Sequence, residues 1–335
     1  MRSPLIAATD HIHPDAVADI RRCADFALVD TDAPARPDVL ERAEVLIVRN
    51  PVPADWFAAT PRMKAVIRHG AGLDLIPVSV ASEEGILVAN VPAVNARAVA
   101  EQVMGQIISL SRNLYQIEFA LRTADWETAR ALAGTSIELG GKTVSIVGVG
   151  AVGRHVASIC SKGFGMRILG VHPSRQSDPD GVVTYVPLRR ALEEADFVVL
   201  ACPLTPATEK LIAGRELGWM KPTAALVNVA RGRVVDGEAL ADALEQGIIA
   251  GAALDVFDPS PLRAGSRWHG LMQARLTPHT AGITQESMRA VSMKVADQVH
   301  AVLAGRFPEH WVNTSARDRI QARWNSLDHY HKQEQ

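Results

Sequence analysis

The chain has 335 residues and a formal net charge of −2, with acidic and basic side chains interspersed along it. This length predicts two domains, and the balanced charge argues against a nucleic-acid partner or an anionic membrane surface. Apolar runs are too short for a membrane-spanning helix, and three widely separated cysteines indicate reduced thiols. We therefore expect a cytoplasmic protein with a small-molecule partner and no metal ion.

Short apolar or β-branched runs alternate with helical patterns throughout the sequence, which predicts an α/β fold with parallel sheets. Residues 14–23 predict a helix, and residues 98–113 predict a long amphipathic helix that links two domains. The runs before that link predict one small open sheet, with strands at residues 5–9, 26–30, 45–48, 65–68 and 86–91.

The second half of the chain repeats the alternation and suits a doubly wound dinucleotide-binding fold. Residues 285–304 predict another amphipathic helix, which returns the chain to the first domain, and a polar tail follows from residue 314 onward. The strands expected in this half lie at residues 143–150, 167–171, 197–202, 225–230, 251–257 and 274–278.

The stretch GVGAVG places Gly148, Gly150 and Gly153 directly after a β-branched run and at the start of a helical one. In that context the spacing is typical of a pyrophosphate-binding turn. The first glycine permits the turn, the second lets the backbone approach the phosphates, and the third lets helix and strand pack closely. Because a helix N-terminus also offers unpaired amide groups, we expect a dinucleotide cofactor here.

The residue that binds the adenosine ribose is expected at the end of the second strand, where an acidic side chain favours NAD by binding the 2′-hydroxyl. His172 occupies that place, and Ser174 and Arg175 follow it. The missing carboxylate removes a repulsion against a 2′-phosphate, and a guanidinium can pair with one. The sequence therefore favours NADP over NAD. The alternative is that Arg175 is solvated or stacks on adenine.

Three polar stretches end strands of the second predicted sheet: NVARG, DVFDPSPL and TPHTAG. Ligands of such sheets bind at the carboxyl ends of the strands, so we expect the chemistry here. Arg231 in the first stretch is an unusual charge at a strand end. Its planar donor fork suits the carboxylate and carbonyl oxygens of a small acid.

With these segments in place, the sequence resembles the D-isomer-specific 2-hydroxyacid dehydrogenase family over nearly its whole length. The resemblance implies two Rossmann-like domains: a flavodoxin-like substrate domain at residues 1–98 and 285–335, and a doubly wound dinucleotide-binding domain at residues 99–284. It also implies a homodimer formed through the cofactor domains. The matching segments are HGAGLDLIPV (69–78), NVPAVNARAVAEQV (90–103), LGGKTVSIVGVGAVG (139–153), PLTPAT (203–208), NVARGRVVD (228–236), ALDVF (253–257) and TPHTAG (277–282).

The resemblance implies an NAD(P)-dependent oxidoreductase that transfers a hydride between nicotinamide and a small 2-hydroxy or 2-oxo acid. It makes Arg231 the substrate-binding arginine and His279 the general acid/base, a role that suits an imidazole titrating near neutrality. The backbone amides around Ala71 and Gly72 would hold the substrate carboxylate.

The expected cofactor contacts extend over the whole dinucleotide domain, with Asp255 near the nicotinamide carboxamide and Pro203 beside the adenosine. The resemblance also implies that the segments with Arg49, Asn50, Arg68, His69 and Trp126 face the substrate cleft or a neighbouring subunit. Arg49 and Arg68 are candidates for binding a second anionic group of the substrate, or are solvated. The full cofactor set is Gly148, Gly150, Ala151, Val152, Gly153, His172, Ser174, Arg175, Pro203, Thr208, Ala230, Asp255, His279 and Gly282.

The family pattern breaks at residue 260, where the family has a glutamate that partners the histidine and this chain has Ser260. A carboxylate beside an imidazole favours its charged form, whereas a hydroxyl orients the ring with far less effect on its charge. Three explanations stay open. Asp258 substitutes for the glutamate, the substrate or a neighbouring residue supplies the charge, or a less basic His279 works at higher pH.

The missing glutamate also keeps a second function open, that of a redox-sensing regulatory protein that binds the dinucleotide without turnover. Arg231 and His279 are both present and favour the enzyme. Within the enzymes, oxidation of formate or phosphite is a minor alternative to oxidation of a 2-hydroxy acid.

Overall fold

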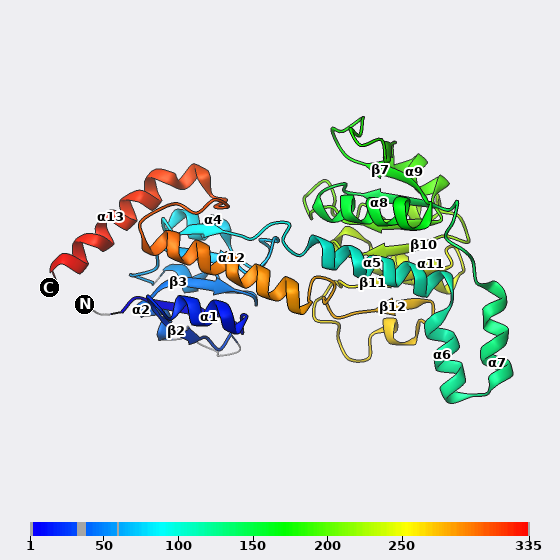
Figure 1. Cartoon of the computed structure of the whole chain (residues 1–335), viewed down its shortest axis with the longest axis horizontal. Helices are drawn as coiled ribbons and strands as arrows, with labels where there is room; N and C mark the ends of the chain where they lie inside the picture. The colour runs from blue at the N-terminus through cyan, green and yellow to red at the C-terminus, as the bar shows by residue number, and fades with distance from the viewer. Residues whose placement is uncertain (1–2, 32–37, 59, 334–335) are drawn as a thin grey trace. The chain divides into compact units, whose positions relative to one another are not determined.

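The computed structural model describes residues 3–31, 38–58 and 60–333. The chain divides into two compact units: unit 1 comprises Met1–Asn95 and Thr284–Gln335, and unit 2 comprises Ala96–Ile283. Each unit is built on one parallel sheet covered by helices, which confirms the predicted fold class (Figure 1). The assignment of the substrate to one unit and the dinucleotide to the other stays a prediction.

The sheet of unit 1 has five parallel strands in the order β2-β1-β3-β4-β5. This order is that of flavodoxin-like folds, in which ligands bind at the carboxyl ends of the strands. The central strands β1, β3 and β4 are almost wholly buried, as expected for parallel strands covered on both faces. The strands are β1 (Leu5–Ala8), β2 (Asp25–Leu28), β3 (Ala43–Val48), β4 (Ala65–Arg68) and β5 (Leu87–Ala89).

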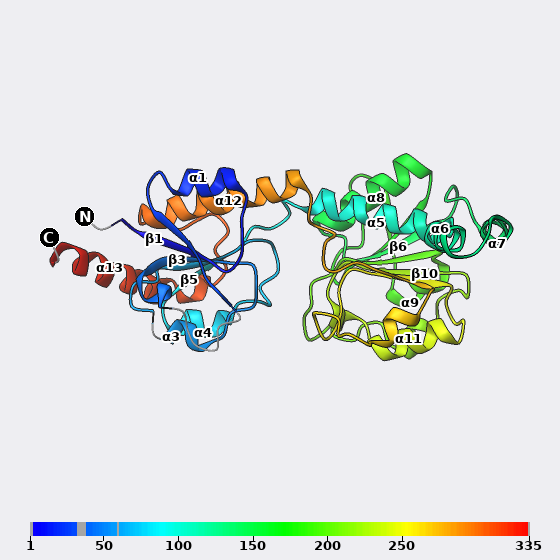
Figure 2. The same ribbon diagram turned by 90° about the horizontal axis from the view of Figure 1, so that it is seen from below.

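Helices α1 (Pro14–Ile20) and α12 (Gln285–Leu303) cover one face of this sheet, and α3 (Asp55–Ala58) and α4 (Val78–Glu83) cover the other (Figure 2). The first face packs Ile47 and Val295 in its core, and the second packs Leu46 and Phe57. The short helix α2 (Val39–Arg42) precedes β3.

The expected polar tail is wrong in one respect, because residues 317–333 form helix α13 (Arg317–Gln333) after a 3₁₀ turn, η4 (Thr314–Ala316). Ile320, Trp324 and Leu327 are buried in it. These three residues recur at the spacing of one helical face, so a short apolar stripe holds an otherwise polar helix to unit 1.

The sheet of unit 2 has seven parallel strands in the order β12-β11-β10-β9-β6-β7-β8, the doubly wound arrangement expected for a dinucleotide-binding fold. The sequence predicted six. The missed strand, β8, is three residues long, too short for a periodic signal, and pairs at the edge beside β7. The strands are β6 (Thr143–Val147), β7 (Arg167–Val171), β8 (Val183–Tyr185), β9 (Phe197–Leu200), β10 (Ala225–Asn228), β11 (Gly251–Leu254) and β12 (Ala274–Leu276).

Helices α5 (Ala96–Ser111) and α8 (Ala151–Phe164) cover one face of the second sheet, and α9 (Leu188–Glu194) and α11 (Gly237–Glu245) cover the other (Figure 2). The remaining short helices are α10 (Gly214–Leu217) and the 3₁₀ turns η1 (Leu132–Thr135), η2 (Gly232–Val234) and η3 (Arg267–Gly270). Within the described residues, no helix combines the length and the apolar character that crossing a membrane requires.

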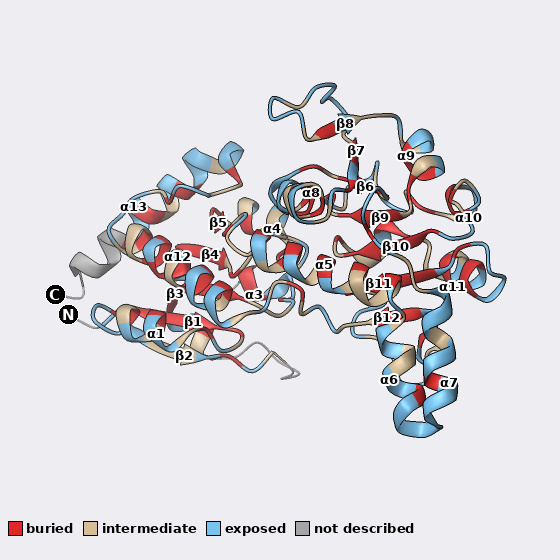
Figure 3. Ribbon diagram, turned by 45° about the vertical axis from the view of Figure 1, so that its right-hand side comes forward, coloured by how far each residue is buried: buried red, intermediate tan, exposed pale blue. Residues whose placement is uncertain are grey.

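Helices α6 (Leu114–Thr123) and α7 (Trp126–Ala131) extend away from the sheet of unit 2 and are largely exposed (Figure 3). The sequence analysis did not predict this pair. Its exposed side chains include large apolar ones with exposed fractions between 47% and 62%: Leu114, Tyr115, Phe119, Leu121 and Trp126. Exposed apolar side chains gathered on one projecting element are typical of an interaction surface.

Candidate active site

The glycine-rich turn joins β6 to α8. Gly148 has a φ of +94°, and a Cβ there would lie 2.6 Å from the backbone of Cys202, so only glycine fits. A Cβ at Gly153 would lie 2.5 Å from the carbonyl oxygen of Gly148, whereas one at Gly150 would meet no described atom within 4 Å. A side chain would therefore clash with the backbone at Gly148 and Gly153, whereas there is free space in front of Gly150.

The N-terminus of α8 faces this open space. The first intrahelical bond runs from the Arg154 amide to the Gly150 carbonyl, so the amides of Ala151, Val152 and Gly153 are available to an anion. Open space in front of a glycine, next to three amides at a helix end, fits the pyrophosphate of a dinucleotide. These residues would hold it.

The loop after β7 folds around His172. The Nδ1 atom of this ring accepts hydrogen bonds from the backbone amides of Ser174, at 3.2 Å, and Arg175, at 3.1 Å. Nη1 of Arg175 donates to the carbonyl oxygen of Val149, at 2.8 Å, so the exposed guanidinium lies against the glycine-rich turn. The structure thus brings these three predicted residues together at one end of the turn.

The PLTPAT segment closes on itself after β9. The Thr208 hydroxyl donates to the Pro203 carbonyl, at 2.6 Å, and accepts from the Thr205 amide, at 2.8 Å. Pro203 is exposed on this loop. Because β9 lies next to β6 in the sheet, this loop and the glycine-rich turn follow neighbouring strands.

Arg231 follows β10 and is positioned by Asn228, which is only 1% exposed. The side-chain oxygen of Asn228 accepts from the Ala230 amide, at 3.0 Å, and its nitrogen donates to the Arg231 carbonyl, at 3.1 Å. Nη1 of Arg231 donates to the carbonyl of Ala230, at 2.7 Å. Next in the chain, a Cβ at Gly232 would lie 2.2 Å from the carbonyl carbon of Phe257, so the loops after β10 and β11 are in direct contact.

His279 follows β12 in a turn held by Asp255, the residue that follows β11. The buried carboxylate accepts from the Thr277 hydroxyl, at 2.6 Å, and from the amides of Thr280 and Ala281, at 2.9 and 3.0 Å. The backbone of His279 has a φ of +56°, and its amide donates to the Asp255 carbonyl, at 2.8 Å. A left-handed histidine is strained by about 1–3 kcal/mol, and these four contacts hold it there.

The substitution at residue 260 lies on the loop after β11. Asp258 and Ser260 are exposed, and the Asp258–Pro259 and Ser260–Pro261 bonds are cis. The charge of Asp258 contributes to raising the pKa of Lys210 and of Arg233, after the larger effects of Asp236 on the first and Glu209 on the second. Asp258 therefore shares its surroundings with two cations, and all three line one cavity of about 190 Å³.

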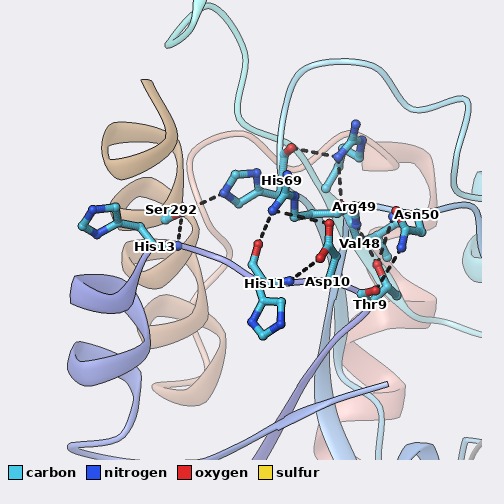
Figure 4. Close-up of polar contacts among 10 residues, drawn as sticks. Thr9, Asp10, His11, His13, Val48, Arg49, Asn50, His69 and Ser292 are labelled. Atoms are coloured by element: carbon cyan, nitrogen blue, oxygen red, sulfur yellow. Dashed lines mark hydrogen bonds and ion pairs between the residues drawn. The ribbon is translucent and has the colours of Figure 1, made fainter. Parts of the chain in front are cut away.

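The carboxyl ends of the strands in unit 1 carry a second group of polar residues. Arg49 and Asn50 both donate from their backbone amides to the Thr9 hydroxyl, and the guanidinium of Arg49 contacts the His11 carbonyl and Asp10 (Figure 4). These bonds tie the end of β3 to the end of β1. Trp126, whose segment was expected to face the substrate or a neighbouring subunit, lies on α7 in unit 2, where it is 62% exposed.

His69 is buried at the end of β4, and its Nε2 atom lies 2.8 Å from the Ser292 hydroxyl of α12 (Figure 4). Burial, followed by the nearby charges of Arg49 and Arg68, lowers the pKa of His69 to about 4. The ring is therefore neutral at physiological pH and acts as a packed, hydrogen-bonded group.

Comparison with known proteins identifies the family. Residues 104–281 match the family model for the NAD-binding domain of D-isomer specific 2-hydroxyacid dehydrogenases. A glyoxylate reductase of Korarchaeum cryptofilum is 35% identical over 92% of this chain and 96% of its own length. The chain belongs to the D-isomer specific 2-hydroxyacid dehydrogenase family. It is an NAD(P)-dependent oxidoreductase that transfers a hydride between a nicotinamide dinucleotide and a small 2-hydroxy or 2-oxo acid.

Other members of this dehydrogenase family match over the same range. The D-3-phosphoglycerate dehydrogenase of Methanocaldococcus jannaschii is 34% identical over 92% of this chain, which spans 59% of that relative's length. A solved structure of an NADPH-dependent glyoxylate/hydroxypyruvate reductase of Sinorhizobium meliloti, in complex with NADP and malonate, superimposes with a TM-score of 0.82. It shares 29% identity, and the match covers 93% of this chain and 97% of that one.

Two positioning residues of this dehydrogenase were missed by the sequence analysis. Asn228 ends β10 and bonds to the loop that carries Arg231, whereas Thr277 follows β12 and donates to Asp255, the residue that holds the turn of His279. A polar residue at the end of an apolar strand was the available signal for both, since an amide or hydroxyl shielded from water requires a hydrogen-bond partner.

Proposed function

We propose that this dehydrogenase interconverts a small 2-oxo acid of about the size of glyoxylate and the corresponding 2-hydroxy acid, with His279 as general acid/base and Arg231 as the substrate-binding arginine. The arrangement of the loops after β10, β11 and β12 carries the proposal. Asp255 bonds the turn that bears His279, and the neighbouring loop packs against Gly232, next to Arg231. The loops that carry two side chains with complementary roles are thereby held at the ends of β10 and β12, the two strands that flank β11.

A dinucleotide held at the glycine-rich turn would supply or accept the hydride at the substrate carbon. In the direction of reduction, His279 gives a proton to the substrate's carbonyl oxygen, and in oxidation it takes the proton from the hydroxyl. The guanidinium of Arg231 binds the carboxylate and carbonyl oxygens and favours the negative charge that develops on the latter. The amides of Ala71 and Gly72 hold the carboxylate.

For residue 260 we propose that His279 works without a carboxylate partner, so that kcat/KM for reduction of the 2-oxo acid falls at a lower pH than in relatives with the glutamate. The surroundings of Asp258 support this choice, because its charge is already shared with Lys210 and Arg233. Substitution of Asp258 by Asn is expected to leave kcat/KM within about threefold. A loss of tenfold or more would favour Asp258 as the substitute carboxylate.

For the cofactor we propose a preference for NADP. The support is the position of Arg175 against the glycine-rich turn and of His172 where an acid would select NAD. His172→Asp is expected to lower the ratio of kcat/KM for NADPH to that for NADH by about tenfold or more, since a carboxylate repels a 2′-phosphate. Arg190→Ala, an exposed arginine of α9, is the control. An unchanged ratio in His172→Asp would contradict the preference.

For the quaternary state we propose a homodimer through unit 2, in which α6 and α7 contact a second copy. The exposed apolar side chains of this pair support it, as does Arg275 beside them. Arg275 is 6% exposed and lies 5.0 Å from the Tyr115 ring centroid, and its Nε and Nη2 have no partner among the described residues. Phe119→Asp should sediment as a monomer, and the exposed control Ile248→Asp should not; two monomeric or two dimeric variants would contradict the interface.

We place the protein in the cytoplasm. Its three cysteines are free, and burial raises the pKa of Cys160 to about 12. A buried, protonated thiol of this kind suits a reducing compartment.

The test of the proposed activity is oxidation of NADPH or NADH with a panel of 2-oxo acids that begins with glyoxylate, repeated with His279→Gln. Turnover of at least one acid, largely lost in the variant, is expected. An absence of turnover with every acid would favour the regulatory function.

A further inference from the structure

The turn after β4 has an unusual hydrogen-bond pattern in which four consecutive carbonyl groups each accept a hydrogen bond from Arg68, Asn90 or Val91. The carbonyl of His69 accepts from Nη1 of Arg68, at 2.8 Å, and that of Gly72 accepts from Nε of the same residue, at 3.1 Å. Between them, the Gly70 carbonyl accepts from the Val91 amide, at 2.9 Å, and the Ala71 carbonyl from the side chain of Asn90, at 2.7 Å.

The amides that follow these carbonyls point the other way. In a trans peptide the N–H lies opposite the preceding carbonyl, so bonding the carbonyls of Gly70, Ala71 and Gly72 turns out the amides of Ala71, Gly72 and Leu73. Within the described part of the chain, these three amides have no hydrogen-bond partner. Three successive outward amides form a concave group of donors that suits one carboxylate.

We propose that Arg68 and Asn90 are positioning residues that create this site: they hold the carbonyls of the turn inward so that the amides of Ala71, Gly72 and Leu73 bind the substrate carboxylate. The proposal rests on the function proposed for Ala71 and Gly72. It adds Leu73 as a third donor and gives Arg68 a role other than direct contact with the substrate.

The guanidinium of Arg68 bonds both to the turn and to the end of the neighbouring strand. Besides the two turn carbonyls, its Nη1 donates to the Val48 carbonyl at the end of β3, at 2.9 Å. A Cβ placed on Gly70, whose φ is +140°, would lie 3.6 Å from the guanidinium carbon, so the guanidinium packs beneath the turn. One planar fork thus joins the ends of β3 and β4 to the far end of the turn, which a lysine with a single ammonium group cannot reproduce.

Asn90 is itself held in place by the backbone on either side of its side chain. Its amide donates to the His310 carbonyl, at 3.1 Å, and its carbonyl accepts from Gln298 of α12, at 2.8 Å. The side-chain amide therefore approaches Ala71 from a fixed position. An aspartate there would present an acceptor to the Ala71 carbonyl and a negative charge close to the three amides.

The charges around the turn favour an anion. Arg49 and Arg68 both act on His69, and Asp10 opposes them with a smaller effect. A carboxylate that approaches the amides therefore meets a positive potential from two half-buried guanidinium groups behind the backbone. Backbone amides are the donors that contact the carboxylate. The guanidinium groups of Arg49 and Arg68, which attract it, lie behind the backbone.

The test compares Arg68→Lys and Asn90→Asp in the full-length enzyme loaded with reduced cofactor, using oxalate as the probe for the carboxylate site. Losing correctly placed donors to a charged ligand costs about tenfold to a hundredfold in affinity. Both variants are expected to raise the Kd of oxalate and the KM of the 2-oxo acid by about tenfold or more, with kcat within about threefold and the cofactor Kd unchanged. Asn90→Asp should have the larger effect because it adds a negative charge.

Arg323 offers a matched control in the same unit. Its guanidinium also holds three backbone carbonyls, those of Met63, at 2.8 Å, Glu84, at 3.0 Å, and Thr60. These carbonyls precede β4 and β5, at the opposite end of the strands. Arg323→Lys is expected to lower the melting temperature while the oxalate Kd stays within about twofold. An equal rise of the oxalate Kd in Arg323→Lys and Arg68→Lys would mean a loss of stability alone and would overturn the proposal.

Ala71→Pro separates this inference from the function on which it rests, because proline removes one of the three amide donors. Melting temperature and cofactor Kd verify that each variant is folded. If Ala71→Pro weakens oxalate binding but Arg68→Lys and Asn90→Asp do not, the positioning roles are wrong and the carboxylate site stands. If a folded Ala71→Pro binds oxalate as the wild type does, the carboxylate site itself is wrong, and the positioning roles fall with it.

Discussion

The strand ends of unit 1 and those of unit 2 are built from different chemical groups. In unit 1, the turn after β4 offers backbone amides, and side chains such as Arg68 and Asn90 bond to the carbonyls behind them. In unit 2, the loops after β10 and β12 offer the side chains of Arg231 and His279, and the backbone is held by Asn228 and Asp255. Backbone amides are sufficient to bind a carboxylate, whereas proton transfer requires a side chain that titrates.

His279→Gln is expected to have the largest effect, because it removes the proposed proton donor and leaves the unit 1 turn intact. The rate of hydride transfer should fall about 10³-fold, within the range for loss of a general acid. The oxalate Kd should change far less, by about tenfold at most. Rapid-mixing measurements of NADPH oxidation with excess 2-oxo acid give the rate. A fall in oxalate affinity as large as the fall in rate would contradict the proposal that the unit 1 turn binds the carboxylate while His279 transfers the proton.

His69 makes the unit 1 region sensitive to acid. Its pKa is about 4 in the folded chain against 6.5 for an ordinary histidine, so between these values the unfolded chain binds a proton that the folded chain does not. Stability contributed by the neutral ring is complete above pH 6.5 and falls by about 3 kcal/mol as the pH drops to 4.

Urea unfolding of the wild type and of His69→Gln, measured at pH 7 and pH 4.5, checks this prediction. The free energy of unfolding should fall more steeply with acidification in the wild type than in the variant. His269→Gln, at an exposed histidine, serves as the control and should fall as the wild type does. Parallel curves for the wild type and His69→Gln would contradict the neutral, buried state of this ring.

Arg231→Lys probes the side-chain character of the unit 2 region. A lysine keeps the charge but lacks the planar fork, and we expect kcat/KM for the 2-oxo acid to fall by about 10- to 100-fold. The cofactor Kd should stay within about twofold. A variant with unchanged kcat/KM would show that charge alone is sufficient at this position.

Ser260→Glu is the smallest change and acts on the charge of His279 alone. A carboxylate beside the ring favours its protonated form, so the pH at which kcat/KM falls should move upward by about one unit or more. The pH profiles of wild type and variant, measured with one 2-oxo acid, test this. Superimposable profiles would mean that position 260 does not govern the histidine.

Much of the fold was predictable because it depends on local patterns. The apolar strands and the GVGAVG turn carry their signal within a few residues, and both parallel sheets followed from it. The elements that were missed depend on distant packing: β8 is a three-residue edge strand, and α13 is polar apart from the stripe that includes Ile320 and Trp324. The α6 and α7 pair exposes its apolar residues, so periodicity gave no burial signal for it.

The site residues also differ in how well the sequence predicted them. Arg231 and His279 were predicted as site residues because polar residues at the ends of apolar strands are conspicuous, and the family resemblance implied their roles; both stay predictions. Arg68 was taken as a candidate to bind a second anionic group, yet its guanidinium bonds to the carbonyls of Val48, His69 and Gly72. Every residue has a carbonyl group, so no sequence pattern reveals that three of them converge on one arginine.

The most direct test of the account is the position of a bound carboxylate, determined in a crystal structure of the enzyme with reduced cofactor and oxalate. The account predicts one carboxylate with its oxygens within hydrogen-bond distance of the amides of Ala71, Gly72 and Leu73, and no contact between oxalate and the guanidinium of Arg68. An oxalate bound directly by Arg68, with those three amides facing solvent, would contradict it.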